Sequence, residues 1–286
     1  MRKRARAHGA ISIVNAIPSG AGAAMGVGLW TEAEVEVYEG KGVEVEIVGA
    51  EDESPLLAEK TVEEVFQRAG VEGLGARVRT FSNIPIGRGL KSSSAAANAI
   101  ALATASAVGL RLNGMELVNL AVDAAIKAGV TITGAFDDAS ASFFGGINVT
   151  DNQRRILLKR FRAPEELEVL ILVPEGKTYT RSVDVEALRS IRRLSERALH
   201  LALEGRVWEA LTLNGFSVAG ALDLDLSPAI DALRAGALGA GISGTGPAVA
   251  AVSRPVDAER VARALQEYGR VLRAKPSNLE AWVRDG

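Results

Sequence analysis

The chain has 286 residues, of which 48% are hydrophobic, enough for the core of one large domain or of two domains of ordinary size. The formal net charge is only −2, so the overall field of the protein gives no reason to expect nucleic acid or an anionic membrane as a partner. Cysteine is absent and only two histidines are present, which excludes disulfides, thiolate catalysis, and zinc sites built on cysteine or on clustered histidines.

The N-terminal segment does not read as a targeting signal. Its basic start leads into the mixed stretch HGAISIVNAIPSG and not into the uninterrupted apolar region of a signal peptide. No apolar run reaches the roughly 18 to 20 residues that a membrane span needs. We therefore expect a cytoplasmic protein with no membrane partner. The basic residues of the start alternate in a way that suits the solvent face of a first strand: Arg2, Lys3, Arg4 and Arg6.

The first elements are strands and small-residue loops. Residues 3–15 have the composition of a strand, and the proline and glycines of residues 18–22 open a loop. Apolar residues then occupy every second position over 33–38 and again over 43–48, with glutamates between them, which predicts two strands. The glycine-rich turn 39–42 makes these two strands a predicted hairpin.

A helix follows, with Ser54 as its cap, Pro55 at its first position and Gly70 as its stop. A strand with alternating apolar residues is predicted next, over 76–82, and the most informative stretch of the sequence follows it directly.

This stretch is a loop broken by proline and glycine, followed by three serines and an alanine-rich run that predicts a long helix. Glycine lets the backbone approach an anion, and the first turn of a helix leaves N–H groups that phosphate oxygens can engage. A strand-to-helix turn with serine caps would have the same composition. The spacing matches neither a Walker A loop nor G-x-G-x-x-G. The residues of this phosphate loop are Pro85, Ile86, Gly87, Arg88, Gly89, Leu90, Lys91, Ser92, Ser93, Ser94 and Ala95.

The next helix has Asn113 as its cap with Glu116 in the capping-box position, and it ends at Gly129. Two adjacent aspartates, Asp137 and Asp138, then precede a further apolar segment. From the residues alone they are typical of a helix start, where carboxylates favour the positive end of the helix dipole.

A composition shift at residues 151–153 predicts a boundary between a first domain, 1–152, and a second, 153–286. The second domain alternates strands and helices without a regular βα rhythm, so we expect an α+β fold and not a doubly wound sheet. Its predicted strands are 167–174, 237–242, 248–253 and 270–274, and its predicted helices are 185–204, 207–222, a short one capped by Ser227 with Pro228 first, and 257–268.

Three ordered motifs give the chain a family resemblance. The run PIGRGLKSSSA from Pro85 resembles the phosphate loop of the GHMP kinases. The segment GAFDDA from Gly134, which ends in Gly145-Gly146, is similar to their active-site segment, and GISGTGP from Gly241 to their third, glycine-rich motif. Within this superfamily the residues of these motifs most resemble those of the archaeal-type shikimate kinases. The resemblance implies two α+β domains with the active site between them.

The resemblance also implies a reaction and its site: phosphorylation of a shikimate hydroxyl by ATP with Mg²⁺. The phosphate loop, Gly244 and Gly246 would bind the nucleotide, and Ser93 would bind the metal ion. Counting back from Gly145 and Ser142 makes Asp138 the residue that orients or deprotonates the hydroxyl, whereas counting forward from Gly134 favours Asp137. The backward count rests on more matches, so Asp138 is preferred.

Two positions depart from the family pattern. His8-Gly9-Ala10 stands where most relatives have P-G-K, so the lysine is missing. The helix-borne glutamate that shares the metal ion falls near Lys127, which leaves Asp123 as the nearest carboxylate on the same helix.

The carboxylate of shikimate calls for a cationic partner, for which Arg181 is the candidate, although a solvated surface arginine fits the sequence as well. Ser19, Thr131 and Thr133 are candidate contacts to the hydroxyls. The alternatives are a GHMP kinase for another small alcohol, such as homoserine or mevalonate, and a GHMP-like protein that binds nucleotide without catalysis. A homodimer is compatible with the sequence.

Overall fold

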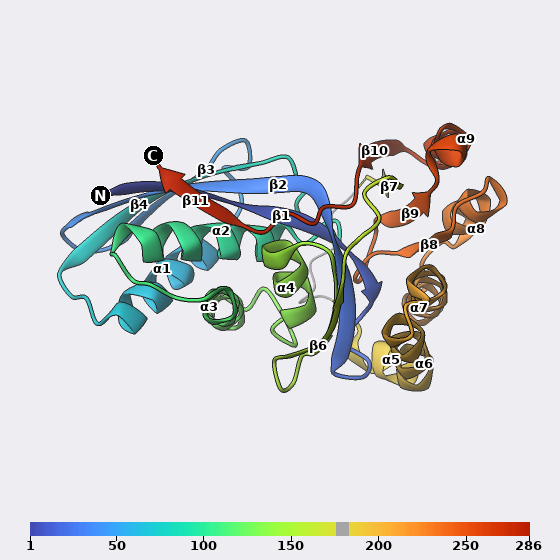
Figure 1. Ribbon diagram of the computed structural model, residues 1–286, viewed down its shortest axis with the longest axis horizontal. Coiled ribbons are helices and arrows are strands. Elements are labelled where there is room, and N and C mark those ends of the chain that lie inside the picture. The colour runs from blue at the N-terminus through green and yellow to red at the C-terminus, as the bar shows by residue number, and fades with distance from the viewer. Residues whose placement is uncertain (176–182) are drawn as a thin grey trace.

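The computed structural model describes residues 1–175 and 183–286 and forms two halves, each built on one sheet (Figure 1). The first half contains β1 (Arg2–Val14), β2 (Ala21–Glu39), β3 (Val43–Ile47), α1 (Leu56–Ala69), β4 (Leu74–Ser82), α2 (Ser92–Ala107), α3 (Gly114–Lys127), α4 (Phe136–Phe144), β5 (Ile147–Asp151) and β6 (Ile156–Phe161). The second contains β7 (Glu168–Val173), α5 (Val185–Ser190), α6 (Arg192–Leu203), α7 (Val207–Leu222), α8 (Ser227–Arg234), β8 (Gly239–Ile242), β9 (Val249–Ser253), α9 (Pro255–Gln266) and β10 (Arg270–Ala274), and β11 (Trp282–Asp285) follows. This mixed architecture confirms the predicted α+β class.

Among the described residues the first sheet has seven strands: five in the order β11-β1-β2-β4-β3, with β5 paired to β2 and β6 paired to β5. The long strand β2, 19 residues, pairs with β4 over its second part and with β5 over its first. The loop predicted for residues 18–22 ends earlier than expected, because β2 already begins at Ala21. The small residues of this stretch lie in a crowded strand: a Cβ built on Gly26 would come 3.0 Å from the Ala141 carbonyl oxygen.

The predicted hairpin of residues 33–48 is wrong. β3 pairs in parallel with β4, which lies between β2 and β3, so α1 is the crossover of a β-α-β unit. Alternation of apolar and polar residues identifies strands but not their partners. The helix α1, which follows β3, lets the chain return so that β4 lies between β2 and β3.

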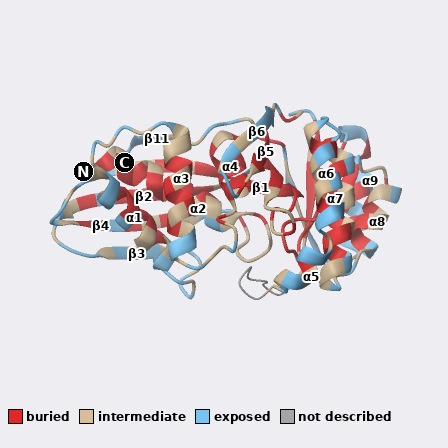
Figure 2. Cartoon of the chain, turned by 90° about the horizontal axis from the view of Figure 1, so that it is seen from below, coloured by how far each residue is buried: buried red, intermediate tan, exposed pale blue. Residues whose placement is uncertain are grey.

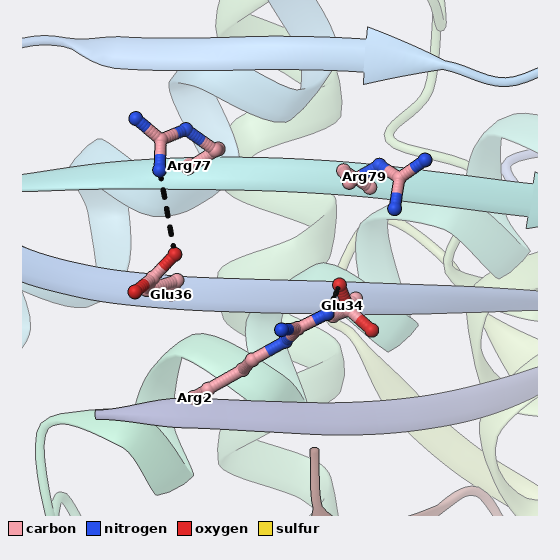
Figure 3. A pocket seen from close by; sticks show the side chains of 5 residues that line it. All are labelled: Arg2, Glu34, Glu36, Arg77 and Arg79. Atoms are coloured by element: carbon pink, nitrogen blue, oxygen red, sulfur yellow. Dashed lines mark hydrogen bonds and ion pairs between the residues drawn. The ribbon is translucent and has the colours of Figure 1, made fainter.

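The two faces of this sheet differ sharply. One face is apolar and packs on α1 and α2 through residues such as Ala5, Val35 and Ile100. The other has no helix over it in Figure 1 and carries strand-wise rows of arginine and glutamate. Figure 3 shows Arg2 of β1, Glu34 and Glu36 of β2, and Arg77 and Arg79 of β4 around a hollow of about 220 Å³. Arg77 pairs with Glu36 at 3.4 Å and Arg2 pairs with Glu34, while Arg79 pairs with Glu46 of β3, so the hollow is a salt-bridged surface.

The second half has a four-stranded antiparallel sheet of order β10-β7-β9-β8, flanked by helices. The helix predicted over 185–204 is broken at Ile191 into α5 and α6. The halves share a core, in which Ile11 and Met25 of the first sheet belong to one buried cluster with Ile171 and Leu211. Figure 2 shows buried residues in red on elements of both halves. No helix among the described residues is long and apolar enough to cross a membrane.

The boundary predicted at residue 152 does not separate the two sheets. β6 lies beyond it in sequence and pairs with β5, and β11 returns from the end of the second half to pair with β1. The first sheet therefore contains segments from both sides of the predicted boundary, and the division into domains at that residue stays a prediction.

Candidate active site

A cavity of about 490 Å³ lies where the two halves meet. The phosphate loop and the first turn of α2 form one side, and the segment from Ala128 to Asp138 forms another. Gly244 and Thr245 reach the cavity from the second half, and Ser12 and Asn15 reach it from the end of β1. The three motifs of the sequence thus surround one space.

The phosphate loop leaves β4 at Ser82 and enters α2 at Ser92. The N-cap residue of α2 is Lys91, in the left-handed region with φ +65°, and it makes no side-chain cap. The first N–H groups of α2 therefore have no capping side chain, and three hydroxyls of this turn line the cavity: Ser92, Ser93 and Ser94. This is the arrangement expected for a phosphate-binding helix start.

The glycine-rich segment of the second half holds this loop in place. Ser243 donates a hydrogen bond from Oγ to the Gly89 carbonyl at 2.8 Å and accepts one from the Ser12 N–H at 3.1 Å. A Cβ on Gly89 would lie 2.2 Å from the Ser243 carbonyl oxygen, and φ at Gly89 is +78°, so only glycine fits there. Asn15 donates to the Gly244 carbonyl at 3.0 Å. These contacts tie both halves to the cavity.

Both aspartates lie in the first turn of α4 and line the cavity, but their surroundings differ. Asp137 is 3% exposed, and its Oδ1 accepts a hydrogen bond from Asn152 Nδ2 at 2.7 Å. Asp138 faces Lys91, with Oδ2 and Nζ 3.1 Å apart and both side chains largely buried. Its Oδ1 is buried and has no hydrogen-bond partner among the described residues. Asp138 therefore has one oxygen held by a cation and one oxygen unpaired.

Burial controls the protonation of this pair. Burial, reinforced by the negative charge of Asp138, raises the pKa of Asp137 to about 7, and Lys91 and the hydrogen bond from Asn152 oppose the rise. Burial also raises the pKa of Asp138, whereas the ammonium group of Lys91 lowers it by charge and by hydrogen bonding. Lys91 therefore favours the ionised carboxylate that a general base requires.

The remaining predicted residues of the phosphate loop and the glycine-rich segment have different places. Ile86, Gly87, Gly89, Lys91 and Gly244 line the cavity. Arg88 donates to the Pro174 carbonyl at 2.6 Å, while Leu90 and Ala95 are buried in the core. Pro85 and Gly246 are not among the described lining residues.

Of the candidate substrate contacts, Thr131 and Thr133 line the cavity. Ser19 does not, among the described residues, and its hydroxyl donates to the Ala21 carbonyl at 3.1 Å. Arg181 lies outside the described residues. Sequence reasoning missed Asn15 and Ser12, whose only signal was a polar side chain in an otherwise apolar strand.

The predicted metal ligands do not come together. Ser93 is exposed and lines the cavity, but Asp123 pairs with Arg155 at 2.6 Å and is not among the described lining residues. The described part of the chain holds no group of three acidic or histidine side chains that could hold a metal ion. Mg²⁺ bound with a nucleotide needs only one or two protein groups besides phosphate oxygens and water, so a hydroxyl donor such as Ser93 fits an ion brought by ATP.

Comparison with known proteins agrees with this geometry. The family model described as GHMP kinases N terminal domain matches residues 57–146, and the model described as GHMP kinases C terminal matches residues 188–271. A shikimate kinase of Methanothrix thermoacetophila is 43% identical over 284 residues, covering 98% of this chain and 96% of the relative. A shikimate kinase of Methanosarcina acetivorans is 46% identical over 264 residues, covering 92% and 89%.

Solved structures of low identity show the same fold. A homoserine kinase from Cytophaga hutchinsonii superposes with a TM-score of 0.79 at 19% identity, covering 99% of this chain and 97% of the other. A galactokinase of Lactococcus lactis complexed with galactose gives 0.78 at 14% identity, covering 98% and 95%. From the two family models and the relatives that match it over nearly its whole length, the chain belongs to the GHMP kinases, beside the archaeal shikimate kinases.

Proposed function

We propose that this protein transfers the γ-phosphoryl group of ATP to a hydroxyl of shikimate and releases ADP and shikimate 3-phosphate. The acceptor is supported by the shikimate kinases that are 40–46% identical to this chain over 88–100% of its length. The chemistry is supported by one observation above the others: the buried pair of Lys91 and Asp138 beside the phosphate loop.

Each residue has a role that follows from its position. The N–H groups of the phosphate loop and of the first turn of α2 bind phosphate oxygens, and Gly89 allows that approach. The unpaired oxygen of Asp138 accepts the proton of the acceptor hydroxyl. At the same time the hydroxyl oxygen bonds to the γ-phosphorus, and the bond between that phosphorus and ADP breaks. The ammonium group of Lys91 lowers the pKa of Asp138 and so favours its ionised form, and as part of the phosphate loop it would also neutralise charge on the transferred phosphoryl group.

Mg²⁺ neutralises phosphate charge when it is bound with ATP, and Ser93 is the residue that would hold it. Lys91 also offers a substitute for the lysine missing at His8-Gly9-Ala10, since it brings a cation to Asp138 from the phosphate loop. Thr131 and Thr133 line the cavity and would contact the hydroxyls of the acceptor.

A panel of alcohols with ATP, Mg²⁺ and a coupled ADP readout tests the proposal. We expect turnover of shikimate and little turnover of homoserine or mevalonate. Robust phosphorylation of either of these, with none of shikimate, would refute the acceptor. Nucleotide binding without turnover of any alcohol would indicate a non-catalytic protein, an outcome that a paired and buried Asp138 argues against. We also place the protein in the cytoplasm, and a homodimer stays a prediction that light scattering would check.

A further inference from the structure

The helix that carries both aspartates has no cap of its own. Its N-cap residue is Ala135, which is in the left-handed region with φ +49° and has no side-chain oxygen to offer. The first N–H groups of a helix need acceptors from outside the helix. Here the acceptor comes from the far end of β5, where Asn152 Oδ1 accepts a hydrogen bond from the Asp137 N–H at 3.2 Å.

The same amide also holds the Asp137 side chain. Asn152 Nδ2 donates to Asp137 Oδ1 at 2.7 Å, so one side chain binds both the backbone and the carboxyl group of Asp137. Thr150 fixes the orientation of the amide, because its hydroxyl donates to Asn152 Oδ1 at 2.7 Å. The Asn152 side chain is buried, with the residue 4% exposed, and Asn152 does not line the cavity.

The backbone of Asn152 makes a third connection. Its N–H donates to the Gly20 carbonyl at 2.9 Å, at the end of the turn that precedes β2. On the other side of Asp137 the backbone of β2 is close, since a Cβ on Gly22 would lie 2.5 Å from Asp137 Oδ2. The first turn of α4 is therefore held between β2 and Asn152, and Asp138 follows directly in the chain.

We propose that Asn152 is a positioning residue for phosphoryl transfer. It acts as a remote cap that sets the first turn of α4, and through that turn it places Asp138 against Lys91 and the acceptor hydroxyl. This inference rests on the proposed function, since it assigns Asn152 to the same reaction. A displacement of about 1 Å of a reacting group can lower a rate by as much as 10²-fold, so a cap of this kind affects catalysis and not only stability.

The test compares Asn152→Ala with Asn148→Ala. Asn148 is also buried and lies on β5, where its Nδ2 donates to the Gly145 carbonyl at 2.9 Å, but it does not line the cavity and contacts neither aspartate. We expect both variants to melt at lower temperature. Only Asn152→Ala should lose kcat, by about 10- to 100-fold, with the KM for ATP within about threefold of the wild type. Asn152→Asp is nearly isosteric and keeps the acceptor while losing the donor, so it should lose kcat as well, even where the alanine variant folds poorly.

A second readout does not depend on activity. The ¹³C resonance of the Asp137 carboxyl should titrate at higher pH in Asn152→Ala than in the wild type, because a hydrogen bond to the ionised form is lost. Among the described residues, the charged groups that share the cavity with Asp137 are Asp138, Lys91, Asp52 and Glu53, and all are unchanged by the substitution. Asn148→Ala should leave this titration in place.

Equal kcat in both alanine variants, or an unshifted Asp137 titration, would overturn the role of Asn152. A wild-type protein that does not phosphorylate shikimate would instead overturn the proposed acceptor. The two failures are distinguishable because the titration needs no substrate.

Discussion

Replacing Lys91 by methionine removes the cation beside Asp138 with little change in side-chain length. The atoms Lys91 Nζ and Asp138 Oδ2 are 3.1 Å apart. At that distance two unit charges in a protein environment attract by about 5 kcal/mol, taking an effective dielectric constant of about 20, and the cost of removing both from water offsets part of this. A carboxylate beside a cation typically has its pKa lowered by about one to three units, so we expect the pKa of Asp138 to rise by that amount in the variant.

The sign of the effect on activity follows. Asp138 accepts a proton, so it must be ionised, and a higher pKa moves the acid limb of kcat/KM to higher pH. We expect this limb to move up by about one to three pH units and kcat at neutral pH to fall by about 10²- to 10³-fold. The assay is the coupled ADP readout with shikimate from about pH 6 to about pH 9, together with melting temperatures to show that the variant is folded.

Lys127→Met is the matched control. Lys127 also pairs with a largely buried carboxylate, that of Glu64, but it lies at the end of α3 and is not among the described residues of the cavity. Lys127→Met should leave the pH profile of kcat/KM unchanged. Lys91→Arg should keep the acid limb of that profile near its wild-type position. An acid limb that does not move in Lys91→Met would show that Lys91 does not control the protonation of Asp138.

Four further predictions follow from the site and from one buried histidine. Asp138→Asn should lose about 10²- to 10⁴-fold in kcat with near-normal melting, as single-turnover rates would show, while Asp137→Asn loses much less; a larger loss at Asp137 would reverse their roles. Burial raises the pKa of Asp137 to about 7 from an ordinary value of 3.8, so its contribution to stability is full below about pH 3.8 and is lost as pH rises through 7. Asp137→Asn should therefore melt a few degrees above the wild type at about pH 8 and lose this advantage gradually as pH falls from 7 toward about 3.8. Ser93→Ala should lower kcat by about 10²-fold, and normal rates at limiting Mg²⁺ would make this serine only a helix-turn residue. Burial lowers the pKa of His8 below its ordinary 6.5, so stability falls as pH drops below that value, and His8→Gln should show a smaller loss of melting temperature between about pH 7.5 and about pH 5 than the wild type.

Signals that act over a few residues predicted local structure well. The capping box of Asn113 and Glu116 is present as expected, and α1 ends at Gly70 in the left-handed conformation. The phosphate loop also lies between a strand and a helix as its composition indicated. In each case the residues that determine the structure are neighbours in the chain, so the pattern can be recognised from sequence.

Features that depend on distant residues were not predictable in this way. The alternation of β3 does not show that β4 will insert beside it, because pairing is set by the whole sheet. Nothing near Lys91 indicates that its ammonium group will meet Asp138. The remote cap by Asn152 had one faint signal, which is that Ala135, before a helix start, cannot cap it.

The return of β11 to the first sheet has a consequence for the order of biosynthesis. Residues 282–285 pair with residues 3–6, and the two ends of the described chain lie side by side (Figure 1). On the ribosome, β1 is made first and its outer edge has no partner until the last strand has emerged, so the nascent sheet carries an open edge while the entire second half is translated. Open edges invite pairing with other chains. The alternating arginines of β1 would protect the nascent sheet during this time, because charged side chains beside an unpaired edge discourage association with other chains until β11 pairs with it.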